Sequence, residues 1–252
     1  MNKDALIDYT LHLADNVLII GHRCSEWCGH GPVLEQDIAI SNMALDYIGQ
    51  ARNLYQYAAE LSGGNATEDS LAYLRDEREF KNLLLTEMPN GDWAQTILRQ
   101  FFFSVYQYYL YTALLRSADS TLAAIAEKSL KEVTYHLRWS SEWVIRLGDG
   151  TEESRRRLLK AVDELWMFTG ESFEMADYET ALLKDAISAD LAMIKDGWEQ
   201  KVKEVFEEAT IEVPAAKTWH QTGGKRGVHT EHLGYLLAEM QHLQRVHPGA
   251  EW

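Results

Sequence analysis

Carboxylate and imidazole side chains at helical spacing are the residues of this sequence that could do chemistry, because such groups bind pairs of iron ions. A carboxylate-bridged di-iron bundle takes a glutamate from each of two helices and a Glu-x-x-His pair from each of two others. The two residues of such a pair project to one side of a helix, which holds both ligands together. The sequence holds one such pair, Glu239 with His242, in its last helical segment. A single pair does not make a di-iron site, and we interpret it as a chance match.

The segment 119–148 carries a second, incomplete ligand pattern. Glu132 precedes His136 by four residues, and Val133 stands where a Glu-x-x-His pair requires its carboxylate. The segment contains a carboxylate and an imidazole, as a di-iron helix does, but not at the spacing that directs both side chains at a pair of irons.

The segment 33–61 must position any further ligands. Its large apolar residues recur at the spacing of one helical face, which predicts a long amphipathic helix with part of that face in a core. These residues are Leu34, Ile38, Leu45 and Ile48. A second line along the same helix holds small and polar side chains, as the centre of a metal-binding bundle does. Its members are Glu35, Ala39, Asn42, Asp46, Gly49 and Asn53.

These residues predict a buried polar network rather than a metal site. Asp46, Arg52, Glu132 and His136 are its predicted members, and Arg52 supplies the positive charge that a metal would bring. Buried charges require such partners. The alternative is a di-iron oxygenase or ferroxidase bundle that binds its own metal through atypical ligands, namely Asp15, Asp46, Glu132 and His136.

Sulfur and imidazole groups crowd into one short stretch, which holds His22, Cys24, Cys28 and His30. Structural zinc sites normally draw their ligand pairs from separated segments, so this spacing argues against zinc. We interpret the two cysteines as thiols at a helix-turn junction, which a reducing compartment leaves unpaired.

The loop 219–232 is the most unusual segment of an acidic chain. Lys225 and Arg226 stand among three glycines ahead of a helix, and His229 follows. The P-loop spacing is absent. These three side chains are a candidate contact for an anion or for another subunit. The alternative is a glycine-shaped turn whose lysine and arginine pair with acids of the same chain.

Composition predicts an all-α protein and excludes several partners. The chain has 252 residues, four prolines and a net charge of −15, and few runs alternate apolar and polar residues. We therefore expect one domain over residues 1–252, no nucleic acid or anionic membrane as partner, and no membrane-spanning helix. An N-terminus without an apolar signal region predicts the cytoplasm. The expected helices cover residues 4–23, 33–61, 67–86, 92–117, 119–148, 151–174, 188–210 and 230–246, with an irregular segment at 211–227.

Several blocks of sequence resemble one known family. They are EWCGH at 26–30, GQARN at 49–53, RDERxFxNLL at 75–84, KExxYHLR at 131–138 and TGGKxGxHTEHLG at 222–234. Together these blocks look like the C subunit of the bacterial phenylacetyl-CoA epoxidase, the multicomponent ring oxygenase of phenylacetate degradation. The resemblance covers nearly the whole chain.

The resemblance implies a ferritin-like fold and a structural role without a catalytic metal or any other cofactor in this chain. It implies two further partners, a catalytic ferritin-like A subunit that holds the di-iron centre and the CoA thioester, and a small B subunit. It also implies a reductase that carries flavin and an iron-sulfur cluster and takes electrons from NADPH. The isolated chain is a candidate homodimer. Laid against the ferritin-like ligand positions, the sequence has Asp15 in the first helix, Asp46 or Gly49 with Arg52 in the second, Gln107 in the third, and Val133 with His136 in the fourth.

Overall fold

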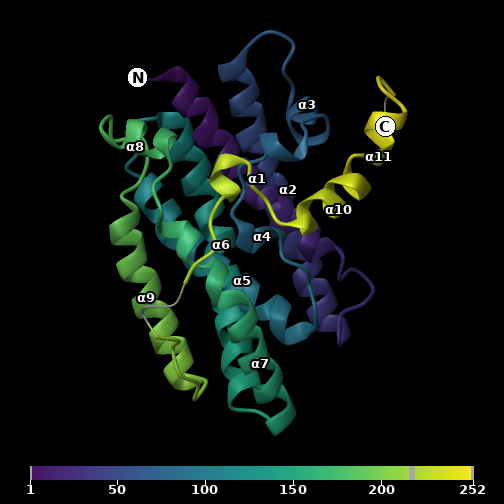
Figure 1. Cartoon of the computed structure of the whole chain (residues 1–252), viewed down its shortest axis with the longest axis vertical. Coiled ribbons are helices and arrows are strands. Elements are labelled where there is room, and N and C mark those ends of the chain that lie inside the picture. The colour runs from purple at the N-terminus through teal and green to yellow at the C-terminus, as the bar shows by residue number, and fades with distance from the viewer. Residues whose placement is uncertain (1, 216–218, 251–252) are drawn as a thin grey trace. The chain divides into compact units, whose positions relative to one another are not determined.

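The regular elements of the protein are helices. The computed structural model describes residues 2–215 and 219–250, and within those ranges it contains no strand. The predicted all-α class, with long helices and shorter additional ones, is therefore confirmed (Figure 1). In chain order the helices are α1 (Lys3–Ser25), α2 (Leu34–Ser62), α3 (Glu68–Tyr73), α4 (Leu84–Glu87), α5 (Trp93–Leu114), α6 (Ser120–Gly148), α7 (Glu152–Leu165), α8 (Asp177–Leu183), α9 (Leu191–Glu208), α10 (Glu231–Met240) and α11 (His242–Val246).

The chain divides into two compact units. Unit 1 is formed by the described residues of 1–88, 176–182 and 223–252, and unit 2 by those of 89–175 and 183–222. Each unit is a helical body with its own pair of long helices, α1 with α2 in unit 1 and α5 with α6 in unit 2. The organisation as one domain over 1–252 stays a prediction.

In unit 1, α1 is buried on almost all sides, as a helix with apolar residues around its whole circumference should be. It lies along α2 (Figure 1). The two backbones approach closely at Gly21, where an added Cβ would lie 3.0 Å from the Cβ of Tyr47. A glycine at this point of α1 lets α2 pack against it.

The buried side of α2 is not the one that its large aliphatic residues predicted. The predicted core residues are exposed, with exposed fractions of 72% for Leu34, 51% for Ile38, 70% for Leu45 and 38% for Ile48. None of the predicted central polar line is fully buried either: Glu35, Asn42 and Gly49 are exposed, and Ala39, Asp46 and Asn53 are half-buried. The buried residues are Ile40, Met43, Ala44, Tyr47, Gln50, Ala51, Leu54, Tyr55 and Ala58. They include alanines, which allow the close approach to α1, and tyrosines, which fill the space beside it.

The prediction of a single helix over 67–86 is also wrong. The segment contains the short helices α3 and α4, with an irregular stretch and a 3₁₀ turn at Glu77–Glu79 between them. Arg75 and Phe80 of this stretch are buried. The stretch is held by side chains of α1, which take the place of helical hydrogen bonds.

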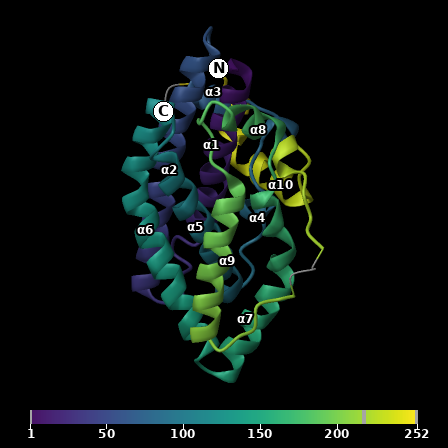
Figure 2. The ribbon, with the colours of Figure 1, turned by 90° about the vertical axis from the view of Figure 1, so that its left-hand side faces the viewer.

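Unit 2 is organised around the aromatic residues of α5. This helix contacts α6, α7 and α9, and Figure 2 shows α6 and α9 on either side of it. Phe102 lies with its ring centroid 5.5 Å from that of Trp198 and 5.7 Å from that of Trp166. The indole N–H of Trp198 also donates to the backbone oxygen of Phe102, at 3.0 Å. Aromatic residues of α5 thus meet more than one neighbouring element.

Helix beginnings lie closer to the predicted bounds than helix ends do. Asp92, Asp119 and Thr151 accept backbone N–H groups at the starts of α5, α6 and α7. The segment 151–174 leaves α-geometry after Leu165, and 230–246 is interrupted at Gln241. Helix α8 lies between the predicted helices. In the irregular segment 211–227, residues 216–218 lie outside the described residues. None of the described helices combines the length and apolarity that crossing a bilayer requires.

Replacing Thr151 with alanine is expected to lower the free energy of unfolding by about 0.5–2 kcal/mol, because α7 loses its cap. The Thr151 hydroxyl accepts the N–H of Ser154 at 3.1 Å, and the Ser154 hydroxyl accepts the N–H of Thr151 at 3.0 Å. Urea unfolding followed by circular dichroism measures the effect. The matched control is Thr151→Ser, which keeps the hydroxyl; an equal loss in both variants would contradict the capping role.

Candidate functional site

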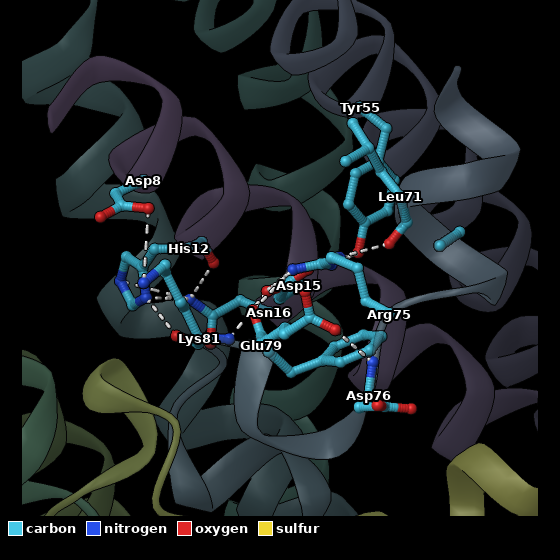
Figure 3. A network of polar contacts seen from close by, with 12 residues as sticks. Asp8, His12, Asp15, Asn16, Tyr55, Leu71, Arg75, Asp76, Glu79 and Lys81 are labelled. Atoms are coloured by element: carbon cyan, nitrogen blue, oxygen red, sulfur yellow. Dashed lines mark hydrogen bonds and ion pairs between the residues drawn. The ribbon is translucent and has the colours of Figure 1, made fainter. Parts of the chain in front are cut away.

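Asp15 lies in a buried polar cluster of unit 1. Helix α1 carries His12, Asp15 and Asn16, whose spacing places them on one side of the helix. All three side chains are buried. Figure 3 shows them beside the irregular stretch that follows α3, with Arg75 reaching back toward Asp15.

The carboxylate of Asp15 is fully engaged by donors of the same chain. Both terminal nitrogens of Arg75 bind it, Nη2 at Oδ1 and Nη1 at Oδ2, the latter at 3.1 Å. The Tyr55 hydroxyl donates to Oδ1 at 2.5 Å, and the backbone N–H of Lys81 donates to Oδ2 at 2.8 Å. Four donors on two oxygens satisfy a carboxylate, and a bidentate arginine is the strongest of such partners.

Arg75 is positioned by further contacts and stays charged. Its Nη1 donates to the backbone oxygen of Glu79 at 2.8 Å, and its Nε donates to that of Leu71 at 2.5 Å. Its guanidinium lies 4.2 Å from the ring centroid of Phe80. Burial acts against the positive charge, but the carboxylate of Asp15 more than offsets it and raises the pKa of Arg75. This cation takes the role that a metal would have beside Asp15.

Tyr55 completes the cluster as a neutral donor. Burial, and after it the negative charge of Asp15, raise the pKa of Tyr55 well above its usual value. The phenol therefore keeps its proton and donates a hydrogen bond to the carboxylate.

His12 and Asn16 fasten the irregular stretch to α1. Nδ1 of His12 lies 2.7 Å from the backbone oxygen of Lys81, and the side-chain oxygen of Asn16 accepts the N–H of Leu83 at 2.8 Å. Burial, and next the charge of Lys225, lower the pKa of His12 to about 4. The ring is therefore neutral near pH 7, and the carbonyl assigns its proton to Nδ1. These polar side chains of α1 therefore hold the irregular stretch in place.

The structure does not place Arg52 where the sequence predicted it. The Arg52 side chain is 71% exposed, and its Nε lies 3.9 Å from Oε1 of Glu68. Arg52 therefore does not supply a buried positive charge; Arg75, which sequence reasoning missed, does. Asp46 is half-buried on the same helix.

The other predicted network residues belong to unit 2. Gln107 and His136 are buried, and Glu132 is half-buried. Burial raises the pKa of Tyr111, and a hydrogen bond with Gln107 acts in the opposite direction without cancelling it. A common network of these residues with Asp15 and Asp46 stays a prediction.

The glycine-rich loop before α10 is bound into unit 1 by two further charge pairs. Nζ of Lys225 lies 2.9 Å from Oε2 of Glu179, and both side chains are buried. Nδ1 of His229 lies 2.8 Å from Oε2 of Glu87, again with both side chains buried. For Lys225 the structure thus agrees with the alternative that a glycine-shaped turn pairs with acids of this chain. Of the three candidate contact residues, only Arg226 is exposed.

The family of the chain follows from comparison with known proteins. A family model described as "Phenylacetic acid catabolic protein" matches residues 1–252. The chain belongs to this family. A curated member, the C subunit of 1,2-phenylacetyl-CoA epoxidase from Escherichia coli K12, is 49% identical over 247 residues, which is 98% of this chain and 99% of that protein. The resemblance seen in the sequence is therefore confirmed.

Within its described residues, this member of the phenylacetic acid catabolic family does not bring together the ligands of a di-iron centre. Among the residues that the structure describes, no three His, Cys, Asp or Glu side chains form a group that could hold a metal ion. The carboxylate in the first ligand position, Asp15, is occupied by Arg75. In the second, Gly49 has no side chain to bind a metal, Arg52 is largely exposed, and the half-buried Asp46 belongs to no such group of ligands among the described residues. The residues therefore do not fit a pair of irons. In the stretch considered for zinc, Cys24 is buried and Cys28 exposed.

Proposed function

We propose that this chain is the non-catalytic structural subunit of a multicomponent 1,2-phenylacetyl-CoA epoxidase that acts in aerobic phenylacetate catabolism. The relative from E. coli carries the name of the C subunit of that enzyme and matches this chain over almost its entire length. Two proteins of nearly equal length and 49% identity share a fold, and the name of the relative supports the same role for this chain.

The observation that carries the proposal is the ion pair between Asp15 and Arg75. A metal-binding carboxylate must have a free lone pair directed at the metal. Both oxygens of Asp15 instead accept hydrogen bonds from Arg75, and Oδ1 and Oδ2 also accept from Tyr55 and Lys81. An iron would have to displace a buried guanidinium, which would leave that charge without its partner.

The proposal assigns the oxygen chemistry to other components of the complex. A ferritin-like catalytic subunit holds the di-iron centre, and a reductase with flavin and an iron-sulfur cluster delivers electrons from NADPH. A further small subunit is part of the complex, which we place in the cytoplasm. This chain supports and orients the catalytic subunit.

Iron content tests the proposal. We expect the chain purified alone to contain no stoichiometric iron, and the chain purified with the catalytic subunit to contain about two irons per pair of these two chains. Inductively coupled plasma mass spectrometry gives the metal, and amino-acid analysis gives the amount of each protein. The companion variant is His136→Ala in this chain. We expect the complex of this variant with the catalytic subunit to keep its iron.

The same measurement separates the two candidate functions. Near-stoichiometric iron in the isolated chain, lost in His136→Ala, would contradict the proposal. It would show that the chain is itself a di-iron oxygenase or ferroxidase with atypical ligands.

A further inference from the structure

One side of α2 exposes large aliphatic residues to solvent in a continuous row. Leu34, Ile38, Asn42, Leu45, Gly49 and Arg52 follow one another at steps of three and four residues, and Ile48 lies next to Gly49 on the same side. We call these seven residues the α2 face. Leu34 and Leu45 are 72% and 70% exposed. From Leu34 to Ile48 the row runs about 21 Å along the helix.

A row of this kind needs an explanation outside the chain. Single exposed aliphatic residues are ordinary, but contiguous apolar surface bordered by polar residues marks interaction sites. The opposite side of α2 already supplies the contacts of this helix with its own core. The α2 face has the pattern of a second buried side.

Gly49 adds an independent observation. Glycine is a poor residue for a helix interior, because it loses more backbone freedom than alanine on folding. Gly21 of α1 is explained by Tyr47, which an added Cβ would meet at 3.0 Å, but an added Cβ at Gly49 would meet nothing within 4 Å. A small residue between large apolar ones on a helix surface allows a second helix to approach closely where the two helices cross.

A hollow lined in part by acidic residues adjoins the C-terminal part of the α2 face. It has a volume of about 280 Å³ and includes Ile48 and Arg52 of the face, with Glu68 and Asp69 of α3. Glu35 lies exposed at the other end of the face. Glu68 already faces Arg52 of this chain, with Nε 3.9 Å from Oε1. Asp69 and Glu35 add negative charge near the two ends of the face, and this charge favours a basic partner, since complementary charges direct association and like charges oppose it.

We infer that the α2 face binds an amphipathic helix of the catalytic subunit, which crosses α2 at Gly49 and places basic side chains near Asp69. This inference rests on the proposed function, because that function supplies the partner. A second copy of this chain fits less well. Each copy carries a net charge of −15 and would bring its own acidic surroundings to the contact.

Biolayer interferometry tests the inference by measuring the affinity of this chain for the catalytic subunit. The two proteins are co-expressed and purified for this measurement. We expect Leu45→Glu and Gly49→Leu each to weaken the association by about tenfold or more, as loss of a central interface contact does. Gly49→Leu is also expected to raise the thermal midpoint of the isolated chain, since leucine is the better helix former. Met193→Glu is the matched control, because Met193 of α9 is equally exposed, at 73%, and lies off the face.

Each outcome decides a separate question. Failure of the unmodified chain to bind the catalytic subunit would overturn the proposed function and the inference with it. Normal binding by the unmodified chain and by both variants would overturn the inference alone. If Leu45→Glu instead turned a dimer of the isolated chain into a monomer and left the affinity for the catalytic subunit unchanged, a second copy would be the occupant, and the inference would again be wrong.

Discussion

Arg75→Met is expected to lower the free energy of unfolding by about 3–5 kcal/mol, because it leaves the buried carboxylate of Asp15 without its counter-charge. Asp15 would keep the hydroxyl of Tyr55 and the N–H of Lys81, but neither carries a positive charge. The oxygens of Glu79 and Leu71 would also lose their arginine donor. The measurement is urea unfolding of the isolated chain at pH 7, followed by tryptophan fluorescence.

Arg52→Met is the matched control, because Arg52 is an exposed arginine of the same unit. We expect its unfolding midpoint to stay that of the unmodified chain, since surface ion pairs contribute little. The double variant Asp15→Leu with Arg75→Met removes both charges and is expected to be more stable than Arg75→Met alone. Equal effects of Arg75→Met and Arg52→Met would show that the buried pair does not hold unit 1 together.

Features that depend on only a few neighbouring residues, such as the starts of helices, could be predicted from the sequence. The cap residues Asp92, Asp119 and Thr151 mark the starts of α5, α6 and α7 because each binds N–H groups two or three residues ahead. The interruption of the ligand pattern at Val133 could likewise be read from residue types alone. Such signals involve one turn of helix and do not depend on the rest of the fold.

The partner of Asp15 could not be found in this way. Arg75 stands 60 residues from Asp15, within a run of charged residues whose composition is that of a solvated helix. What distinguishes this run is that apolar residues needing burial, Phe80 and Leu83, follow at once. Arg52 has the same charge and lies on the helix where ligands were predicted. Residue types alone could not show which of the two arginines is buried beside Asp15.

The error on α2 has a different physical cause. Helical periodicity shows which residues share a side, but it does not show whether that side meets the chain's own core or another molecule. Leu45 and Leu54 have the same side chain on the same helix, and they are 70% and 1% exposed. Their surroundings in three dimensions make the difference. A prediction of burial from the hydrophobic pattern alone assumes that every apolar side of a helix is buried within its own chain.

The pair of Glu87 and His229 should make the stability of the chain depend on pH. Glu87 accepts from four groups: Nδ1 of His229 at 2.8 Å, the amide of Asn82 at 2.8 Å, and the N–H and the hydroxyl of Thr230, both at 2.7 Å. Nε2 of His229 lies 2.9 Å from the backbone oxygen of Phe80. Because both ring nitrogens face acceptors, both must donate, and the ring is an imidazolium. Burial lowers the pKa of His229, but the hydrogen bond and charge of Glu87 more than offset this and raise the pKa.

Glu87→Gln is therefore expected to lower the free energy of unfolding at pH 6 by about 3–5 kcal/mol, because the imidazolium loses its buried counter-charge. A pKa above 6.5 in the folded chain means that the folded state binds the proton more tightly than the unfolded state. The stabilisation is thus complete below pH 6.5 and is lost as the pH rises through the raised pKa of His229. The measurement is the urea midpoint at a series of pH values between about 5 and 9. In Glu87→Gln this decline above pH 6.5 should be absent, whereas His242→Gln, at an exposed histidine of α11, should retain it. A decline of the same size in Glu87→Gln would place the titrating group elsewhere and contradict the assignment of His229 as a buried cation.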